Sequence, residues 1–81
     1  MITVYSKNNC PFCVQAKNLL RMKGIDYQEV KIDEDQQAKD FVLEQGHRTV
    51  PQIYKDGALL VEGGYQGLVK QPADFFQNLK G

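Results

Sequence analysis

The only two cysteines of this chain, Cys10 and Cys13, are separated by two residues and follow a strand-like run. Residues 2–5 are all β-branched or aromatic, and this composition favours a buried strand. After Cys10, apolar residues recur at helical spacing to about Met22, and Gly24 ends the predicted helix. The pair therefore lies where a strand passes into a helix, a placement typical of redox-active cysteines.

This placement favours a reactive form of Cys10. The first turn of a helix has unpaired N–H groups and a partial positive charge, which stabilise an anion. A thiolate is such an anion, and it is the nucleophilic form of cysteine. Pro11 suits the first turn because its missing N–H is not needed there, and Asn9 is the candidate N-cap.

Size and charge narrow the class of protein. The chain has 81 residues, of which 42% are hydrophobic and 25% charged, so we expect one small domain spanning residues 1–81. Ten basic and ten acidic side chains cancel, which argues against nucleic acid or an anionic membrane as partner. No apolar run approaches the ~20 residues of a membrane span. We expect a cytoplasmic protein, in which a lone cysteine pair is catalytic rather than structural.

A second strand and helix follow the cysteine segment. Residues 27–32 alternate in the manner of a strand. Asp33 and Gln36 resemble a capping box, and the helix that they open is expected to stop at Gly46. Two strands joined by a helix imply a parallel, right-handed crossover.

The remaining residues predict a hairpin and a last helix. Asp56-Gly57 between two strand-like runs, residues 52–55 and 58–62, is a strong hairpin signal. A final helix is predicted over residues 72–80, whereas residues 65–71 could form either a short helical turn or a loop. The predicted order is thus β-α-β-α-β-β-α. Its expected aromatic core residues are Phe41, Phe75 and Phe76.

This order, with the cysteine pair after the first strand and a proline opening the third, resembles the thioredoxin superfamily. Within it the chain resembles the glutaredoxins over essentially all 81 residues. Cys-Pro-Phe-Cys is close to the Cys-Pro-Tyr-Cys usual in that family, and Thr49-Val50-Pro51 and Gly63-Gly64 occupy family positions. The resemblance implies an α/β protein of thioredoxin-like (glutaredoxin) fold, with a four-stranded mixed sheet flanked by helices.

The resemblance also implies an activity and a mechanism. Cys10 would be the attacking thiolate and Cys13 the resolving thiol of a glutathione-dependent thiol–disulfide oxidoreductase. Cys10 would form a mixed disulfide with a protein disulfide or a glutathione mixed disulfide, and Cys13 or glutathione would release the product. Glutathione is then a co-substrate, no cofactor is bound permanently, no metal is needed, and the protein is a monomer.

The family pattern assigns substrate contacts to particular residues. Lys7 matches a lysine that meets a glutathione carboxylate, and Phe12 matches an aromatic residue that flanks glutathione. Val50-Pro51 should form a cis bond facing the disulfide, with a backbone that pairs with the substrate. The candidate substrate-binding residues are Lys7, Phe12, Thr49, Val50, Pro51, Gly63, Gly64, Tyr65 and Gln66.

One departure from the family pattern supports an alternative. Glutaredoxins often carry an acidic residue after Gly-Gly, where this chain has Tyr65-Gln66-Gly67. That run is similar to glutaredoxin-like redoxins, which donate electrons to ribonucleotide reductase and are reduced by thioredoxin reductase. A third possibility is an iron–sulfur cluster held between two subunits, which Pro11 beside Cys10 disfavours.

Several side chains have two interpretations. His47 is either a surface histidine or a proton donor near the thiols, and it is the only further nitrogen or sulfur ligand that a zinc site could use. Lys7 and Arg48 are either surface charges or anion-binding groups. Tyr65 either contacts glutathione or caps the last helix.

Overall fold

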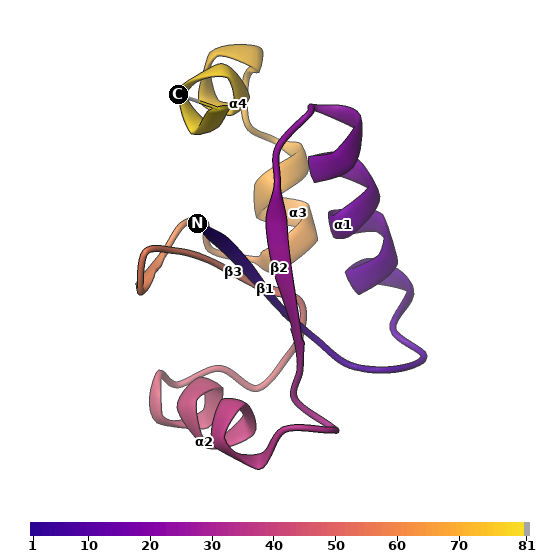
Figure 1. Ribbon diagram of the computed structural model, residues 1–81, viewed down its shortest axis with the longest axis vertical. Helices are drawn as coiled ribbons and strands as arrows, with labels where there is room; N and C mark the ends of the chain where they lie inside the picture. The colour runs from indigo at the N-terminus through magenta and orange to yellow at the C-terminus, as the bar shows by residue number, and fades with distance from the viewer. Residues whose placement is uncertain (81) are drawn as a thin grey trace.

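A computed structural model describes residues 1–80 of the chain, in which strand and helix alternate twice before a pair of strands and two final helices (Figure 1). No helix among these residues has both the length and the apolar character needed to cross a bilayer. The elements are β1 (Ile2–Ser6), α1 (Pro11–Met22), β2 (Tyr27–Lys31), α2 (Gln36–Glu44), β3 (Gln52–Lys55), β4 (Ala58–Leu59), α3 (Gly64–Val69) and α4 (Ala73–Lys80).

The four strands form one mixed sheet in the order β2-β1-β3-β4. β1 runs parallel to β2, with Ile2 opposite Tyr27, so a crossover is needed and α1 provides it. β3 is antiparallel to both β1 and β4. The thioredoxin-like arrangement expected from the sequence is therefore confirmed, with one helix more than predicted.

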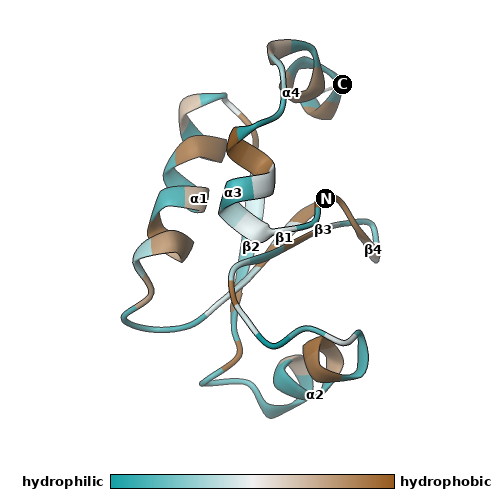
Figure 2. Ribbon diagram, turned by 180° about the vertical axis from the view of Figure 1, so that it is seen from behind, coloured by the Kyte–Doolittle hydropathy of each residue, from teal (hydrophilic) through white to brown (hydrophobic). Residues whose placement is uncertain are grey.

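The helices cover both faces of the sheet (Figure 1). α1 and α3 pack against each other on one face, and α2 lies on the other. Around the turns of α1 and α2, Figure 2 shows hydrophobic and hydrophilic residues alternating, as in helices with one buried face. The main core lies between the sheet and the α1–α3 layer. It consists of Ile2, Val4, Ala16, Leu20, Ile25, Ile53, Val61, Leu68 and Phe76.

The three phenylalanines expected in the core differ in burial. Phe76 is 4% exposed and belongs to the main core, as predicted. Phe75 is half-buried and packs edge-on against Phe76. Phe41 is also half-buried, but on the α2 face of the sheet, where its ring lies 5.4 Å from that of Tyr5 and 5.3 Å from that of Tyr54. The core prediction is therefore confirmed for Phe76, whereas Phe75 packs at the edge of that core and Phe41 packs on the opposite face of the sheet.

The capping-box prediction for α2 was wrong by two residues. Asp35 is the N-cap, and its side chain accepts a hydrogen bond from the Ala38 N–H. Asp33 instead accepts hydrogen bonds from the backbone and side-chain nitrogens of Asn8. Asn8, which is 25 residues away in the sequence, thus binds the Asp33 carboxylate that the local pattern had assigned to the cap of α2.

Three other boundaries differ from the sequence expectation. Cys10 rather than Asn9 is the N-cap of α1. Residues 65–71, which the sequence left open, mostly form helix α3. β4 ends at Leu59 rather than at residue 62, because the chain turns there toward Gly63, which has a left-handed backbone at φ 86°.

Candidate active site

The two cysteines lie at the start of α1, close to the end of β1. They form a disulfide, with Cα atoms 5.2 Å apart. The Cys10 sulfur caps the helix, because it accepts a hydrogen bond of 3.2 Å from the Cys13 N–H. Cys10 is 8% exposed and Cys13 is 1% exposed. Only the first sulfur therefore lies at the edge of solvent, which suits it to attack an incoming disulfide.

The loop before β3 faces this disulfide. Its Val50-Pro51 bond is cis, as expected. The Cys10 sulfur lies 3.8 Å from the Val50 carbonyl oxygen. A disulfide sulfur has no proton to donate, so this is a contact in the oxidised form, and it becomes a possible hydrogen bond once Cys10 is a thiol.

The start of α3 packs against the same loop. At Gly64 the backbone has φ 59°, and a Cβ atom there would overlap the Pro51 carbonyl oxygen. Because no larger residue fits this approach, the glycine sets how closely α3 reaches Pro51. Gly63 precedes it as the helix N-cap, also with a left-handed backbone.

Most candidate substrate residues line one groove beside the cysteine pair, with a volume of about 240 Å³. Two aromatic rings in its lining stack on each other: the ring of Phe12, which is 49% exposed, and the ring of Tyr65 have centroids 6.2 Å apart. We call this the aromatic groove. Its lining residues are Phe12, Thr49, Val50, Pro51, Gly63, Tyr65 and Gln66.

Lys7 and Gly64 do not line the aromatic groove. Gly64 is buried behind it. Lys7 lines an adjoining cavity of about 170 Å³ together with Lys39 and Arg48, and Thr49 and Val50 line both hollows. Lys7 and Arg48 are thus brought together on the side of the loop away from Tyr65. Sequence reasoning missed Lys39, because α2 meets this loop only in the folded sheet.

A partly buried polar network lies next to the cysteine loop. Glu29 of β2 accepts hydrogen bonds from Ser6 at 2.6 Å and from Lys17 at 2.7 Å. Burial alone would raise the pKa of Glu29, but these hydrogen bonds, together with the charges of Lys17 and Lys31, hold the pKa below its ordinary value. Glu29 therefore stays ionised and joins α1 to β2 next to the site.

His47 does not face the cysteines. Its Nε2 lies 2.7 Å from the Tyr54 hydroxyl on the α2 face, and it makes no side-chain hydrogen bond to either cysteine within residues 1–80. Burial raises the pKa of Tyr54. In the part of the chain that the structure describes, no three His, Cys, Asp or Glu side chains gather in a way that could hold a metal ion.

A thioredoxin-like fold with a cysteine pair at a helix N-terminus, the first cysteine at the edge of solvent and the second almost fully buried, defines a thiol–disulfide oxidoreductase. The family model described as Glutaredoxin matches residues 2–60. The chain belongs to the glutaredoxin family, and it is a dithiol redox protein of that type.

Relatives within the family fall into two groups. Glutaredoxin 3 of Escherichia coli strain K12 is 35% identical over 80 residues, which cover 85% of this chain and 96% of that protein. Glutaredoxin-like protein NrdH of Lactococcus lactis strain MG1363 is 45% identical over 56 residues, covering 69% of this chain and 78% of the relative. The holo form of glutaredoxin C1 from Populus tremula x tremuloides superposes with a TM-score of 0.77 at 25% identity, over 99% of this chain and 78% of that one.

Proposed function

We propose that the protein reduces protein disulfides and glutathione mixed disulfides with glutathione as the electron donor. The observation that carries this proposal is the aromatic groove, in which Phe12, Tyr65 and the Val50-Pro51 backbone lie beside the Cys10 sulfur, which contacts the Val50 carbonyl oxygen. A groove that is bounded by two rings and a backbone edge suits a short extended peptide. The glutaredoxin family membership makes glutathione the expected tripeptide.

The charges suggest an orientation for glutathione. Its cysteine sulfur would lie at Cys10, and its γ-glutamyl end would extend past Gly63 toward Gln66. Its glycine carboxylate would extend past Thr49 toward Lys7, where Lys39 and Arg48 add positive charge. This arrangement uses every candidate residue of the sequence analysis except Gly64, which acts by allowing α3 to approach Pro51.

The chemistry needs no further cofactor. The Cys10 thiolate attacks the glutathionyl sulfur of a mixed disulfide, a Cys10–glutathione disulfide forms, and the substrate leaves as a thiolate that takes up a proton. A second glutathione thiolate then attacks the bound glutathionyl sulfur, which releases oxidised glutathione and restores the Cys10 thiolate. With a protein disulfide, the Cys10 thiolate attacks one substrate sulfur, and the other leaves as a thiolate that takes up a proton. Cys13 then loses its proton and attacks the Cys10 sulfur of the mixed disulfide, which expels the second substrate sulfur as a thiolate. The resulting Cys10–Cys13 disulfide is reduced by two glutathiones, which leave as oxidised glutathione.

The test is turnover of a small glutathione mixed disulfide, with glutathione, glutathione reductase and NADPH as the recycling system. We expect NADPH oxidation that is proportional to the protein concentration and is lost in Cys10→Ser. If the reduced protein forms no mixed disulfide with oxidised glutathione and gives no turnover, the proposal is wrong.

A second candidate is a redoxin that is reduced by thioredoxin reductase and passes electrons to ribonucleotide reductase. The observation that favours it is Gln66, which places no carboxylate where a glutathione ammonium group would lie. The similarity to an NrdH protein is in line with it. Parallel assays separate the two candidates: efficient reduction of the Cys10–Cys13 disulfide by thioredoxin reductase, without turnover by glutathione, would favour the redoxin.

A further inference from the structure

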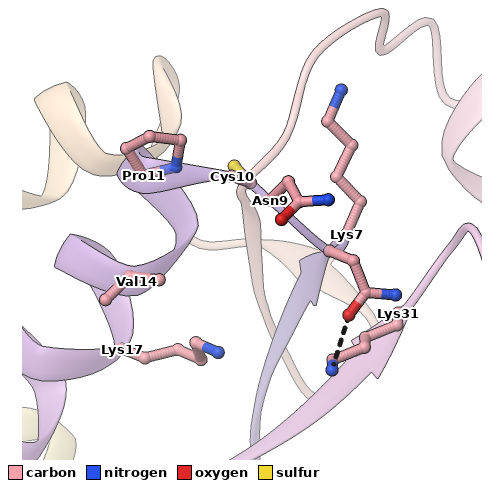
Figure 3. Close-up of a pocket in the computed structure, with 8 residues that line it drawn as sticks. Lys7, Asn9, Cys10, Pro11, Val14, Lys17 and Lys31 are labelled. Atoms are coloured by element: carbon pink, nitrogen blue, oxygen red, sulfur yellow. Dashed lines mark hydrogen bonds between the residues drawn. The ribbon is translucent and has the colours of Figure 1, made fainter.

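A second groove lies on the other side of the cysteine loop, between the first half of α1 and the end of β2 (Figure 3). It is an open hollow of about 550 Å³. Cys10 lines this groove and does not line the aromatic groove. We call it the lysine groove, because its main lining residues are Lys7, Lys17, Lys31, Cys10, Pro11 and Val14.

The lysines of this groove are held in place by other polar groups. The Lys17 ammonium lies 2.7 Å from a Glu29 oxygen, and the Lys31 ammonium lies 3.0 Å from the Asn8 side-chain oxygen. In Figure 3, Lys17 extends from α1 and Lys31 from β2 into the same space, whereas Lys7 points the other way. An ammonium group has three N–H donors, so Lys17 and Lys31 each keep donors for a ligand.

No carboxylate lines the lysine groove, although acidic residues lie nearby. Glu29 is half-buried beneath it and already bound by Ser6 and Lys17. Asp33 and Glu34 are exposed and accept hydrogen bonds from Asn8, which lines the groove. The lining of the groove therefore carries ammonium groups beside the nucleophile, and the nearest carboxylates lie just outside that lining.

We propose that the lysine groove binds an acidic segment next to the reactive cysteine of a disulfide-containing protein substrate. A protein disulfide at Cys10 continues beyond the sulfur, at about 3.3–3.6 Å per residue, so an Asp or Glu a few residues away reaches Lys17 and Lys31. This inference rests on the proposed attack of Cys10 on protein disulfides, and it adds which proteins are attacked fastest. It does not depend on the source of electrons.

The charge selection should be moderate. An ion pair open to solvent is worth about a 1.4- to 5-fold change in affinity, so two pairs multiply to about 2- to 25-fold. We expect the middle of that range, about a 3- to 10-fold preference. Because Lys17 and Lys31 are only partly buried, dissolved ions screen their charges, and the preference should weaken as the ionic strength rises.

The experiment uses reduced protein in single turnover, with no glutathione present. Two peptides carry the same internal disulfide, one flanked by two Asp residues and one by two Lys residues. The second-order rate constant for each is divided by its rate constant with dithiothreitol, which removes differences in intrinsic reactivity. At 20 mM salt, we expect the corrected rate constant of the acidic peptide to be about 3- to 10-fold larger than that of the basic peptide. The ratio of the two rate constants should fall toward 1 at 300 mM salt.

Lys31→Gln is the diagnostic variant, and Lys55→Gln is its matched control. Lys55 carries the same charge but lies opposite Ile2, at the end of the sheet far from the cysteines. Lys31→Gln should reduce the acidic preference at least twofold, whereas Lys55→Gln should leave it unchanged. Equal rates for the two peptides, or equal effects of the two variants, would overturn the proposal. If the protein shows no turnover with glutathione but still prefers the acidic peptide, the proposed function is wrong and the lysine-groove proposal stands.

Discussion

The backbone N–H of Cys13 donates a hydrogen bond to the sulfur of Cys10, 3.2 Å away. The first cysteine is thus the N-cap of the helix that carries the second. After reduction, a thiolate on Cys10 would keep this N–H and the partial positive charge of the helix end, whereas Cys13 lies inside the helix and is almost fully buried. One local arrangement therefore gives the two sulfurs different roles.

The first prediction concerns these roles. Cys10→Ser should abolish all thiol–disulfide exchange without unfolding the protein, because a serine oxygen can still cap α1. Cys13→Ser should keep reduction of glutathione mixed disulfides and lose reduction of protein disulfides. Both activities are measured for each variant, together with its thermal unfolding midpoint, which shows whether the variant is folded. Equal loss of the two activities in Cys13→Ser would contradict the assignment of Cys13 as the resolving thiol.

The second prediction concerns the ring of Phe12. Phe12→Ala should weaken the apparent affinity for glutathione mixed disulfides by about 2- to 10-fold, since a stacked aromatic contact is worth about 0.5–1.5 kcal/mol. The stability should change little, because the ring is already 49% exposed. Met22→Ala, at the other end of α1 and 81% exposed, is the control and should leave KM unchanged. An unchanged KM in Phe12→Ala would mean that the Phe12–Tyr65 stack is not a substrate contact.

The third prediction compares two glycines with left-handed backbones. Gly46→Ala adds a methyl group that, apart from its chain neighbours, meets no atom of residues 1–80 within 4 Å, so only the backbone conformation is penalised, by about 1–2 kcal/mol. Gly64→Ala has the same penalty and also forces the methyl group against the Pro51 carbonyl oxygen. It should therefore be the more destabilising substitution in urea unfolding, and it should lower activity, because α3 moves away from the loop that faces Cys10. Equal destabilisation by the two substitutions would show that α3 can shift freely.

The fold was predictable to the extent that local patterns determine it. The spacing of apolar residues predicts α1 and the final helix, and Asp56-Gly57 predicts the β3–β4 hairpin. The cap of α2 was not predictable, because Asp33 and Asp35 both stand at plausible capping positions. The choice between them depends on Asn8, which reaches Asp33 only after β1 and β2 have paired.

The candidate site also has a part that the sequence predicts and a part that only the folded chain reveals. The cysteine pair, the Val50-Pro51 turn and Gly63 are motifs in the sequence, and the fold places them together. The lysine groove has no such motif, because Lys17 and Lys31 are 14 positions apart on different elements. Two signals could have revealed it. Lys17 lies one helical turn beyond Cys13, and the carboxyl ends of parallel strands β1 and β2 meet at one edge, which brings Lys31 next to Ser6.

The last prediction concerns the pH dependence of stability. The pKa of Glu29 is lower in the folded protein than its ordinary value of 4.5, so its ionised form stabilises the fold. This contribution is complete above about pH 5.5, and it is lost as the pH falls through the folded pKa. Glu29→Gln cannot ionise and should lack that dependence. We expect the wild type to be more stable than Glu29→Gln by about 1 kcal/mol at pH 7, the magnitude of a partly exposed ion pair.

The difference between the two proteins should shrink between pH 5.5 and pH 3 in urea unfolding at matched ionic strength. Subtracting the curves removes the other carboxylates whose pKa is lowered, Asp33 and Asp56, since both proteins contain them. Lys17→Met tests the same ion pair by removing its cationic partner, whose ammonium nitrogen lies 2.7 Å from the Glu29 oxygen. Its stability should also converge on the wild-type value in acid. Parallel curves for all three proteins would mean that Glu29 and Lys17 do not contribute an ion pair to the stability of the fold.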